Sequence, residues 1–159
     1  MNKMLIGFLI LTVVFSLAAG GVQARATQTP YQFTVTDVEV GVPERVWVDG
    51  GILHIREQPV KTSITGDIVG SAVTIRNVNL DLSTGDGSAW GTFVRSVTWQ
   101  GLSGTFEGHF TAKITGSSTV VQLVGHGTED FEGMQIRDVL TLVAPDVFEG
   151  EGIILNSNG

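Results

Sequence analysis

The chain has 159 residues and no cysteine, and its 16 acidic and nine basic side chains give a formal net charge of −7. The absence of cysteine excludes a disulfide framework and a lipid anchor on a lipobox cysteine. The acidic balance, with no basic cluster to offset it, argues against binding to nucleic acid and against attraction to an anionic membrane surface.

Residues 1–26 have the layout of a signal peptide. Lys3 precedes an apolar run over 4–19, and small residues with two A-x-A-like cleavage sites follow. An uncleaved membrane anchor is the alternative, but the run is shorter than the roughly 20 residues that a spanning helix needs. We therefore expect a signal-peptide helix over 1–26, export to a secreted or periplasmic location, and no stable membrane span after cleavage. Residues 27–159 would then form a single domain.

The rest of the chain has the composition of consecutive strands and shows no convincing amphipathic helix. β-Branched and aromatic residues recur in short runs that glycines separate, a pattern typical of strands joined by turns. The expected strands, with 45–57 counted as a hairpin, cover 31–40, 45–57, 67–82, 89–99, 104–115, 118–126, 134–144 and 147–155.

Two local features refine this assignment. Asp49-Gly50-Gly51 predicts the tight turn of the hairpin, because glycine tolerates the positive φ that such a turn demands. In the long run 67–82, the apolar phase shifts between Ile75 and Val78, which predicts a β-bulge there.

The series predicts an all-β fold with a single antiparallel barrel of about eight strands. Glycines interrupt several otherwise good strands. A strand that coils tightly around a small barrel uses glycine to form the kinks and bulges that the coiling requires. These glycines are Gly70, Gly91, Gly108 and Gly125. A barrel of this size has an interior just wide enough for side chains or for one small ligand.

The densest polar stretch, Gly-His-Gly-Thr-Glu-Asp-Phe-Glu-Gly over 125–133, has two interpretations. It could be a metal loop, but its acids do not follow the order of a calcium-binding loop. We interpret it as a turn: 118–143 should form an antiparallel hairpin with 127–133 as its solvent-exposed connection. The acids would then be solvated, and Phe131 would pack into the core.

Other catalytic or metal-binding groupings are weakly supported. His54, His109 and His126 show no local pairing, so no metal site is predicted, and no cofactor is expected. Ser103 lacks the strand-to-helix setting of a nucleophile elbow. Four carboxylates lie in expected strands, and any that faces inward should have a raised pKa. They are Asp67, Asp81, Glu107 and Asp138.

Aromatic side chains are the candidates for a ligand pocket in the lumen. An apolar pocket lined by aromatic rings is typical of small-molecule binding, and a filled core is the alternative. The candidate ligand-binding residues are Trp47, Trp90, Phe93, Trp99, Phe106 and Phe110.

Glycine-rich turns between long strands also carry a family resemblance. The segments 91–93, 104–108 and 127–134, within 60–145, resemble those of allene oxide cyclase-like barrels and the related dirigent proteins, which include small secreted microbial members of unknown function. The resemblance implies a calycin-like or allene-oxide-cyclase-like barrel of eight antiparallel strands with an apolar cavity. It assigns no polar site residue to this chain.

Three functions therefore remain open. The first is an exported binding or accessory module that holds a small apolar ligand. The second is a cyclase- or isomerase-like enzyme that uses polar groups in the lumen, and the third is a structural or cell-surface interaction protein. The side chains that line the lumen distinguish the binding module from the enzyme. The sequence does not predict the oligomeric state.

Overall fold

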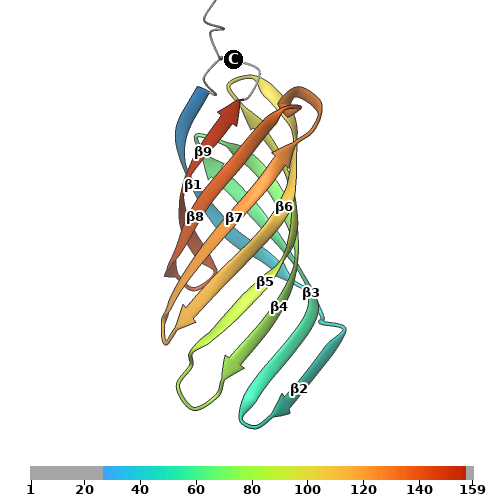
Figure 1. The fold of residues 1–159 in the computed structure, drawn as a ribbon, viewed down its shortest axis with the longest axis vertical. Helices are drawn as coiled ribbons and strands as arrows, with labels where there is room; N and C mark the ends of the chain where they lie inside the picture. The colour runs from blue at the N-terminus through green and yellow to red at the C-terminus, as the bar shows by residue number, and fades with distance from the viewer. Residues whose placement is uncertain (1–26, 157–159) are drawn as a thin grey trace, which may run out of the picture.

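The computed structural model describes residues 27–156, and the expected signal-peptide helix over 1–26 lies outside the described residues. Nearly all of the described chain is β-strand (Figure 1). The elements are β1 (Thr27–Val40), β2 (Arg45–Asp49), β3 (Ile52–Gly66), β4 (Val69–Asp81), β5 (Gly87–Trp99), β6 (Leu102–Thr115), β7 (Ser118–Gly127), the 3₁₀ turn η1 (Glu129–Phe131), β8 (Met134–Ala144) and β9 (Val147–Asn156).

The strands form a closed antiparallel barrel with one additional strand. Their order in the sheet is β1-β9-β8-β7-β6-β5-β4-β3-β2, and an additional β1–β3 pairing closes the ring. Eight strands therefore make the barrel, and β2 continues the sheet outside it as the partner of β3. The predicted all-β antiparallel barrel is confirmed. Among the described residues, no helix is long and apolar enough to cross a membrane.

The β2–β3 hairpin forms where the sequence predicts it. Gly50 and Gly51 connect the strands with φ values of 55° and 84°. Positive φ at both central residues is the geometry of a type I′ turn, whose twist matches that of the strands it joins. In Figure 1 this hairpin projects from the lower end of the barrel.

The bulge expected in β4 between Ile75 and Val78 is absent. The β4–β5 register is unbroken from Val69 to Leu80. Thr74 and Arg76 line the lumen, whereas Ile75 lies on the opposite face. The apparent shift of apolar phase therefore reflects polar side chains that face inward, and the strand keeps its alternation throughout.

The irregularity lies instead in the neighbouring strand, β3. Ile55 pairs with Val78, and the next pair joins Gln58 to Arg76. β3 thus advances by three residues while β4 advances by two, which is the signature of a bulge. Glu57 lies in this bulge with φ 54°. The bulge separates the part of β3 in the barrel wall from the part in the projecting hairpin.

Each of the four glycines that interrupt the expected strands pairs with a larger residue that faces inward. The pairs are Gly70 with Val97, Gly91 with Phe110, Gly108 with Phe93, and Gly125 with Ile136. A Cβ on Gly125 would lie only 2.8 Å from the Phe93 ring. A Cβ on Gly70, Gly91 or Gly108 would instead lie 2.0 Å or less from a backbone oxygen of the neighbouring strand. Gly125 therefore leaves space for an aromatic ring, and the other three allow the wall strands to approach closely.

The hydrophobic core fills one end of the barrel. Its largest fully buried side chains are Ile64, Ile68, Phe106, Phe131, Ile136 and Ile154. Phe131 enters from the β7–β8 connection, and its ring stacks on that of Phe106 with centroids 4.7 Å apart. At this closed end, Thr27 of β1 pairs with Asn156 of β9. The lumen at the opposite end remains partly open.

Candidate functional site

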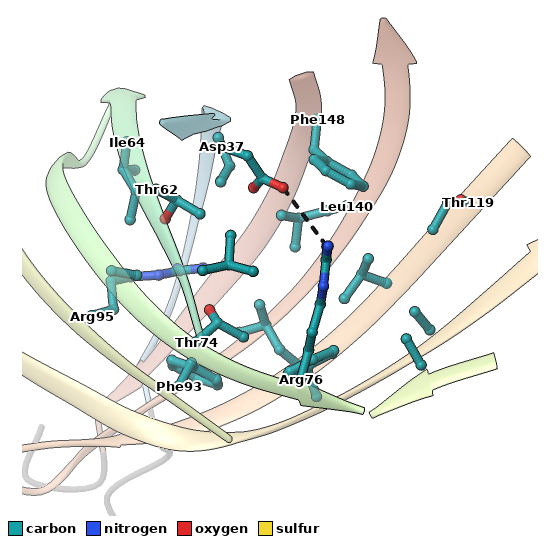
Figure 2. Close-up of a pocket in the computed structure, with 18 of the residues that line it drawn as sticks. Asp37, Thr62, Ile64, Thr74, Arg76, Phe93, Arg95, Thr119, Leu140 and Phe148 are labelled. Atoms are coloured by element: carbon teal, nitrogen blue, oxygen red, sulfur yellow. Dashed lines mark ion pairs between the residues drawn. The ribbon is translucent and has the colours of Figure 1, made fainter. Parts of the chain in front are cut away.

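The candidate site is a cavity of about 230 Å³ in the lumen. Its lining residues extend from the middle of the barrel toward the end that carries the β4–β5, β6–β7 and β8–β9 turns. Figure 2 shows the side chains that surround it. Most of its lining side chains are apolar. The polar ones are Asp37, Thr62, Thr74, Arg76, Arg95 and Thr119.

The alternation of side chains along each strand determines which residues face the lumen. In β5 the residues from Phe93 to Trp99 alternate strictly between buried and exposed. Phe93, Arg95 and Val97 therefore share the inward face, although Arg95 is charged. Arg95 is not among the candidate residues that the sequence suggested, because those were catalytic and aromatic residue types. The alternation of β5 is the sequence signal that could have identified it.

Arg95 belongs to a buried cluster at the inner end of the cavity. Its Nη1 lies 2.6 Å from Oδ2 of Asp138 on β8, and the two side chains are 3% and 0% exposed. The Tyr31 hydroxyl donates a hydrogen bond to the other carboxyl oxygen. The guanidinium also lies over the rings of Phe33 and Phe93, at 5.0 and 5.6 Å from their centroids. The cluster joins β1, β5 and β8 across the lumen.

Burial is the largest influence on the pKa values of Asp138 and Tyr31. It raises the pKa of Asp138, while Arg95 and the hydrogen bond from Tyr31 act in the opposite direction. Asp138 is thus the one of the four candidate carboxylates that faces inward with a raised pKa. Burial, and then the nearby Asp138, also raise the pKa of the Tyr31 phenol, so the phenol stays protonated and serves as a donor.

Two polar atoms on the cavity wall have no hydrogen-bond partner among the described residues. They are Nε of Arg95 and Oγ1 of Thr62, and both are buried. Thr62 pairs with Ala72, which in turn pairs with Arg95. The two polar side chains therefore lie on one level of the barrel with only a methyl group between them, and both point into the cavity in Figure 2.

A second, weaker ion pair lies nearer the mouth. Arg76 Nη1 is 3.9 Å from Asp37 Oδ2, drawn as a dashed line in Figure 2. Arg76 Nε also donates to Gln58 Oε1 at 2.9 Å. Burial raises the pKa of Asp37, the neighbouring Arg76 lowers it, and Asp146 raises it further. The lumen therefore contains two arginines, and each lies beside one aspartate: Arg76 beside Asp37, and Arg95 beside Asp138.

The aromatic candidates divide into three groups. Phe93 and Phe110 line the cavity. Trp99 and Phe106 are buried in the core of the closed end. The other two, Trp47 and Trp90, lie outside the lumen and are 40% and 37% exposed.

These two tryptophans belong to a cluster on the outer face of the sheet, with Trp47 on the projecting hairpin and Trp90 on β5. The Arg56 guanidinium lies between their rings, 5.1 Å from the centroid of Trp47 and 5.0 Å from that of Trp90. Trp47 also stacks on His54 with centroids 4.7 Å apart. The expectation that these tryptophans line the lumen is corrected, because it was based on residue type and not on strand phase.

The remaining candidates do not form a site. His109 and His126 are exposed on the outer wall, and the described residues contain no group of three or more His, Cys, Asp or Glu that could hold a metal ion. Asp67 accepts a hydrogen bond from the Gln32 backbone, and Asp81 accepts two from Ser83. Glu107 is exposed on β6.

The acidic stretch after β7 is a turn that packs on the barrel. β7 and β8 pair antiparallel, as expected. The connection is exposed at Glu129 and Asp130, but Phe131 is fully buried. Asp130 accepts a hydrogen bond from the Ser103 backbone at 3.0 Å. The predicted hairpin with solvent-exposed acids in its connection is therefore confirmed, as is the predicted burial of Phe131.

Comparison with known proteins adds no functional assignment. No protein-family model matches the chain. A search of curated proteins likewise finds no similar sequence. The interpretation of the cavity therefore depends on its own chemistry.

Proposed function

We propose that this protein binds a small, uncharged and largely apolar molecule in the lumen of its barrel. The observation that carries the proposal is the cavity of about 230 Å³ with a mostly apolar wall. Apolar clefts with a few convergent polar groups are the usual form of small-molecule sites. The protein would act as a binding or accessory module, and export to an extracytoplasmic location remains a prediction from the sequence.

The polar wall atoms indicate the chemistry of the ligand. A buried polar atom without a partner is unfavourable, and a ligand that supplies the partner gains binding free energy. Arg95 Nε can only donate, and the Thr62 hydroxyl can also donate. A ligand oxygen that accepts hydrogen bonds, such as a ketone, ester or ether oxygen, would satisfy either atom once a small side-chain movement turns that buried atom toward the cavity.

Charge balance favours a neutral ligand over an anion. Arg95 is already paired with Asp138, and Arg76 lies beside Asp37. A carboxylate in the cavity would add a charge with no free counter-ion, and the burial of an unpaired charge is strongly unfavourable.

Cavity size limits the ligand further. An apolar cavity of about 150 Å³ can hold benzene. The present cavity is larger, so it suits a molecule of roughly ten non-hydrogen atoms. Three probes of similar shape separate the effects of apolar packing, a hydrogen-bond acceptor and a negative charge on binding. Isopropylbenzene is apolar, acetophenone has a carbonyl oxygen in place of one methyl group, and benzoate is charged.

Binding of these three probes can be measured by chemical-shift titration of the protein. We expect acetophenone to bind more tightly than isopropylbenzene, and benzoate to bind least. An Ala112→Phe variant should lose binding of all three, because Ala112 lines the cavity. Val94→Phe is the matched control, because Val94 is 44% exposed on the outer wall of β5. If Ala112→Phe folds normally and binds the probes unchanged, the lumen is not the binding site.

A cyclase- or isomerase-like activity is the second candidate, and Asp37 is the observation that favours it. This carboxyl lines the cavity, and burial raises its pKa, as is common for general acids and bases. Arg76 could stabilise negative charge on a reacting oxygen. Asp37→Asn should abolish such a turnover while probe binding persists. Equal turnover by the variant would remove this candidate.

A further inference from the structure

The free edge of the sheet is β2. It is the last strand in the sheet order and pairs with β3 alone. All five of its residues, Arg45–Asp49, are exposed, and Figure 1 shows the β2–β3 hairpin projecting beyond the barrel. Within the part of the chain that the structure describes, no strand pairs with its outer edge. Such an edge is a template for pairing with another strand.

The sequence of this strand is complementary to itself. It reads Arg-Val-Trp-Val-Asp, with one positive end, one negative end and a symmetric apolar centre. When two copies pair antiparallel about Trp47, Arg45 of each copy lies opposite Asp49 of the other. Val46 then lies opposite Val48, and the two Trp47 side chains face each other.

We propose that two copies of this chain associate by antiparallel pairing of their β2 strands about a two-fold axis at Trp47. The axis generates the Arg45–Asp49 pair twice, once on each side of the tryptophans, as a two-fold interface requires. Directly opposed residues share a face of the sheet, and pairs of opposite charge or of aromatic and β-branched residues stabilise it. The charge order of the strand thus selects a second copy as the occupant of this edge.

Other arrangements of the same strand lose this complementarity. A parallel pair places Arg45 opposite Arg45, and like charges directly opposed are destabilising. An antiparallel pair centred on Val46 or Val48 leaves Arg45 and Asp49 opposite uncharged residues. Only the register centred on Trp47 pairs all five residues with both charges matched.

The length of the strand limits the strength of the association. Pro43 precedes it, and Gly50 begins the turn that ends it. Five paired residues on each copy form a small interface, and small interfaces give weak association that depends on concentration. The structure therefore predicts a monomer–dimer equilibrium and not a permanent dimer.

Charge exchange tests the register directly. Sedimentation of the purified protein over a concentration series should show reversible dimerisation. Arg45→Asp alone and Asp49→Arg alone should each weaken it by about tenfold or more, because each change creates like-charge pairs at both ends. The combined variant R45D/D49R should recover wild-type association. A wild type that stays monomeric up to about 1 mM, or a combined variant as weak as the single ones, would overturn the proposal.

Disulfide trapping gives a second, independent readout, because the chain has no native cysteine. Opposed Cα atoms in an antiparallel pair are about 4.5–5.5 Å apart, which is within the span of a disulfide. Trp47→Cys should therefore form a covalent dimer under mild oxidation. Val94→Cys, exposed on the barrel wall, is the matched control and should cross-link only by slow random collision. Equal cross-linking of the two variants would contradict pairing at β2.

Discussion

Arg95 and Asp138 form an ion pair inside the barrel, with Arg95 Nη1 2.6 Å from Asp138 Oδ2 and both side chains almost inaccessible to solvent. They lie on β5 and β8, which are not neighbours in the sheet. The pair thus connects two walls of the barrel through its lumen. It engages Nη1 of Arg95, whereas Nε is buried without a hydrogen-bond partner among the described residues.

Removal of one partner of this pair should be strongly destabilising. Asp138→Ala leaves the Arg95 charge buried without its counter-ion, and we expect it to lower the free energy of unfolding by about 3–5 kcal/mol. Replacement of both charges, by Arg95→Met with Asp138→Leu, should lose much less, because no unpaired charge remains. Urea unfolding of the single and double variants measures the difference. Equal losses in the two variants would contradict this account.

Thr62→Val should separate stability from binding. The Thr62 hydroxyl is buried without a partner among the described residues, so its replacement by a methyl group should raise the free energy of unfolding by about 1 kcal/mol. The same variant should weaken acetophenone binding and leave isopropylbenzene binding unchanged. Thr62→Ser, which keeps the hydroxyl, is the control for affinity. A destabilised Thr62→Val protein would mean that the hydroxyl is hydrogen-bonded in solution, contrary to this prediction.

Asp37 should make stability depend on pH in a defined direction. Burial raises the pKa of Asp37 in the folded protein, so its contribution to stability is fully present below the unfolded pKa of about 3.9 and is lost as the pH rises through the folded pKa. Asp37→Asn removes this loss, and Arg76 keeps its hydrogen bond to Gln58. The variant should therefore be more stable than wild type at neutral pH, and the gap should close below about pH 4. Thermal unfolding across this pH range measures the difference in stability between the variant and the wild type. A difference that grows in acid would contradict a raised pKa of Asp37.

The β7–β8 connection should tolerate changes to its acids but not to its aromatic residue. Phe131→Ala should lower the free energy of unfolding by about 3–5 kcal/mol, because the ring is fully buried. Glu129→Asn combined with Asp130→Ser should change it by less than about 0.5 kcal/mol. Glu129 has φ 57°, a conformation that asparagine adopts readily. Urea unfolding compares the two, and a midpoint that rises with added calcium would instead indicate a metal loop.

Much of the fold could be predicted from local signals. The Gly50-Gly51 turn and most of the strands are properties of short segments, and the structure contains them where expected. The expected series omitted residues 58–66, which form the second half of β3 and pair with β1. Closure of the barrel through β1 and β3 was not predictable in the same way, because this pairing bypasses β2 along the chain. The sequence pattern places the bulge in the wrong strand because an inward-facing arginine, Arg76, disguises the alternation of β4.

The site was less accessible from the sequence. Asp138 could be named only as one of several carboxylates, since the register that brings it to Arg95 joins strands far apart in the sequence. Size and hydrophobicity single out the tryptophans, but these properties describe a ligand pocket and an exposed cluster equally well. Trp90 shares the exposed phase of β5, whereas Phe93 and Arg95 share the buried one, so strand phase was the better guide.

The pairing of Thr27 with Asn156 at the closed end has a practical consequence. Both ends of the described chain leave the barrel at the pole opposite the cavity mouth. A fusion protein, an affinity tag or a surface linker attached at either end would therefore hold the molecule by its base, with the entrance directed toward bulk solution. Immobilised in this way, the protein can be exposed to a stream of volatile or dissolved compounds without obstruction of its lumen.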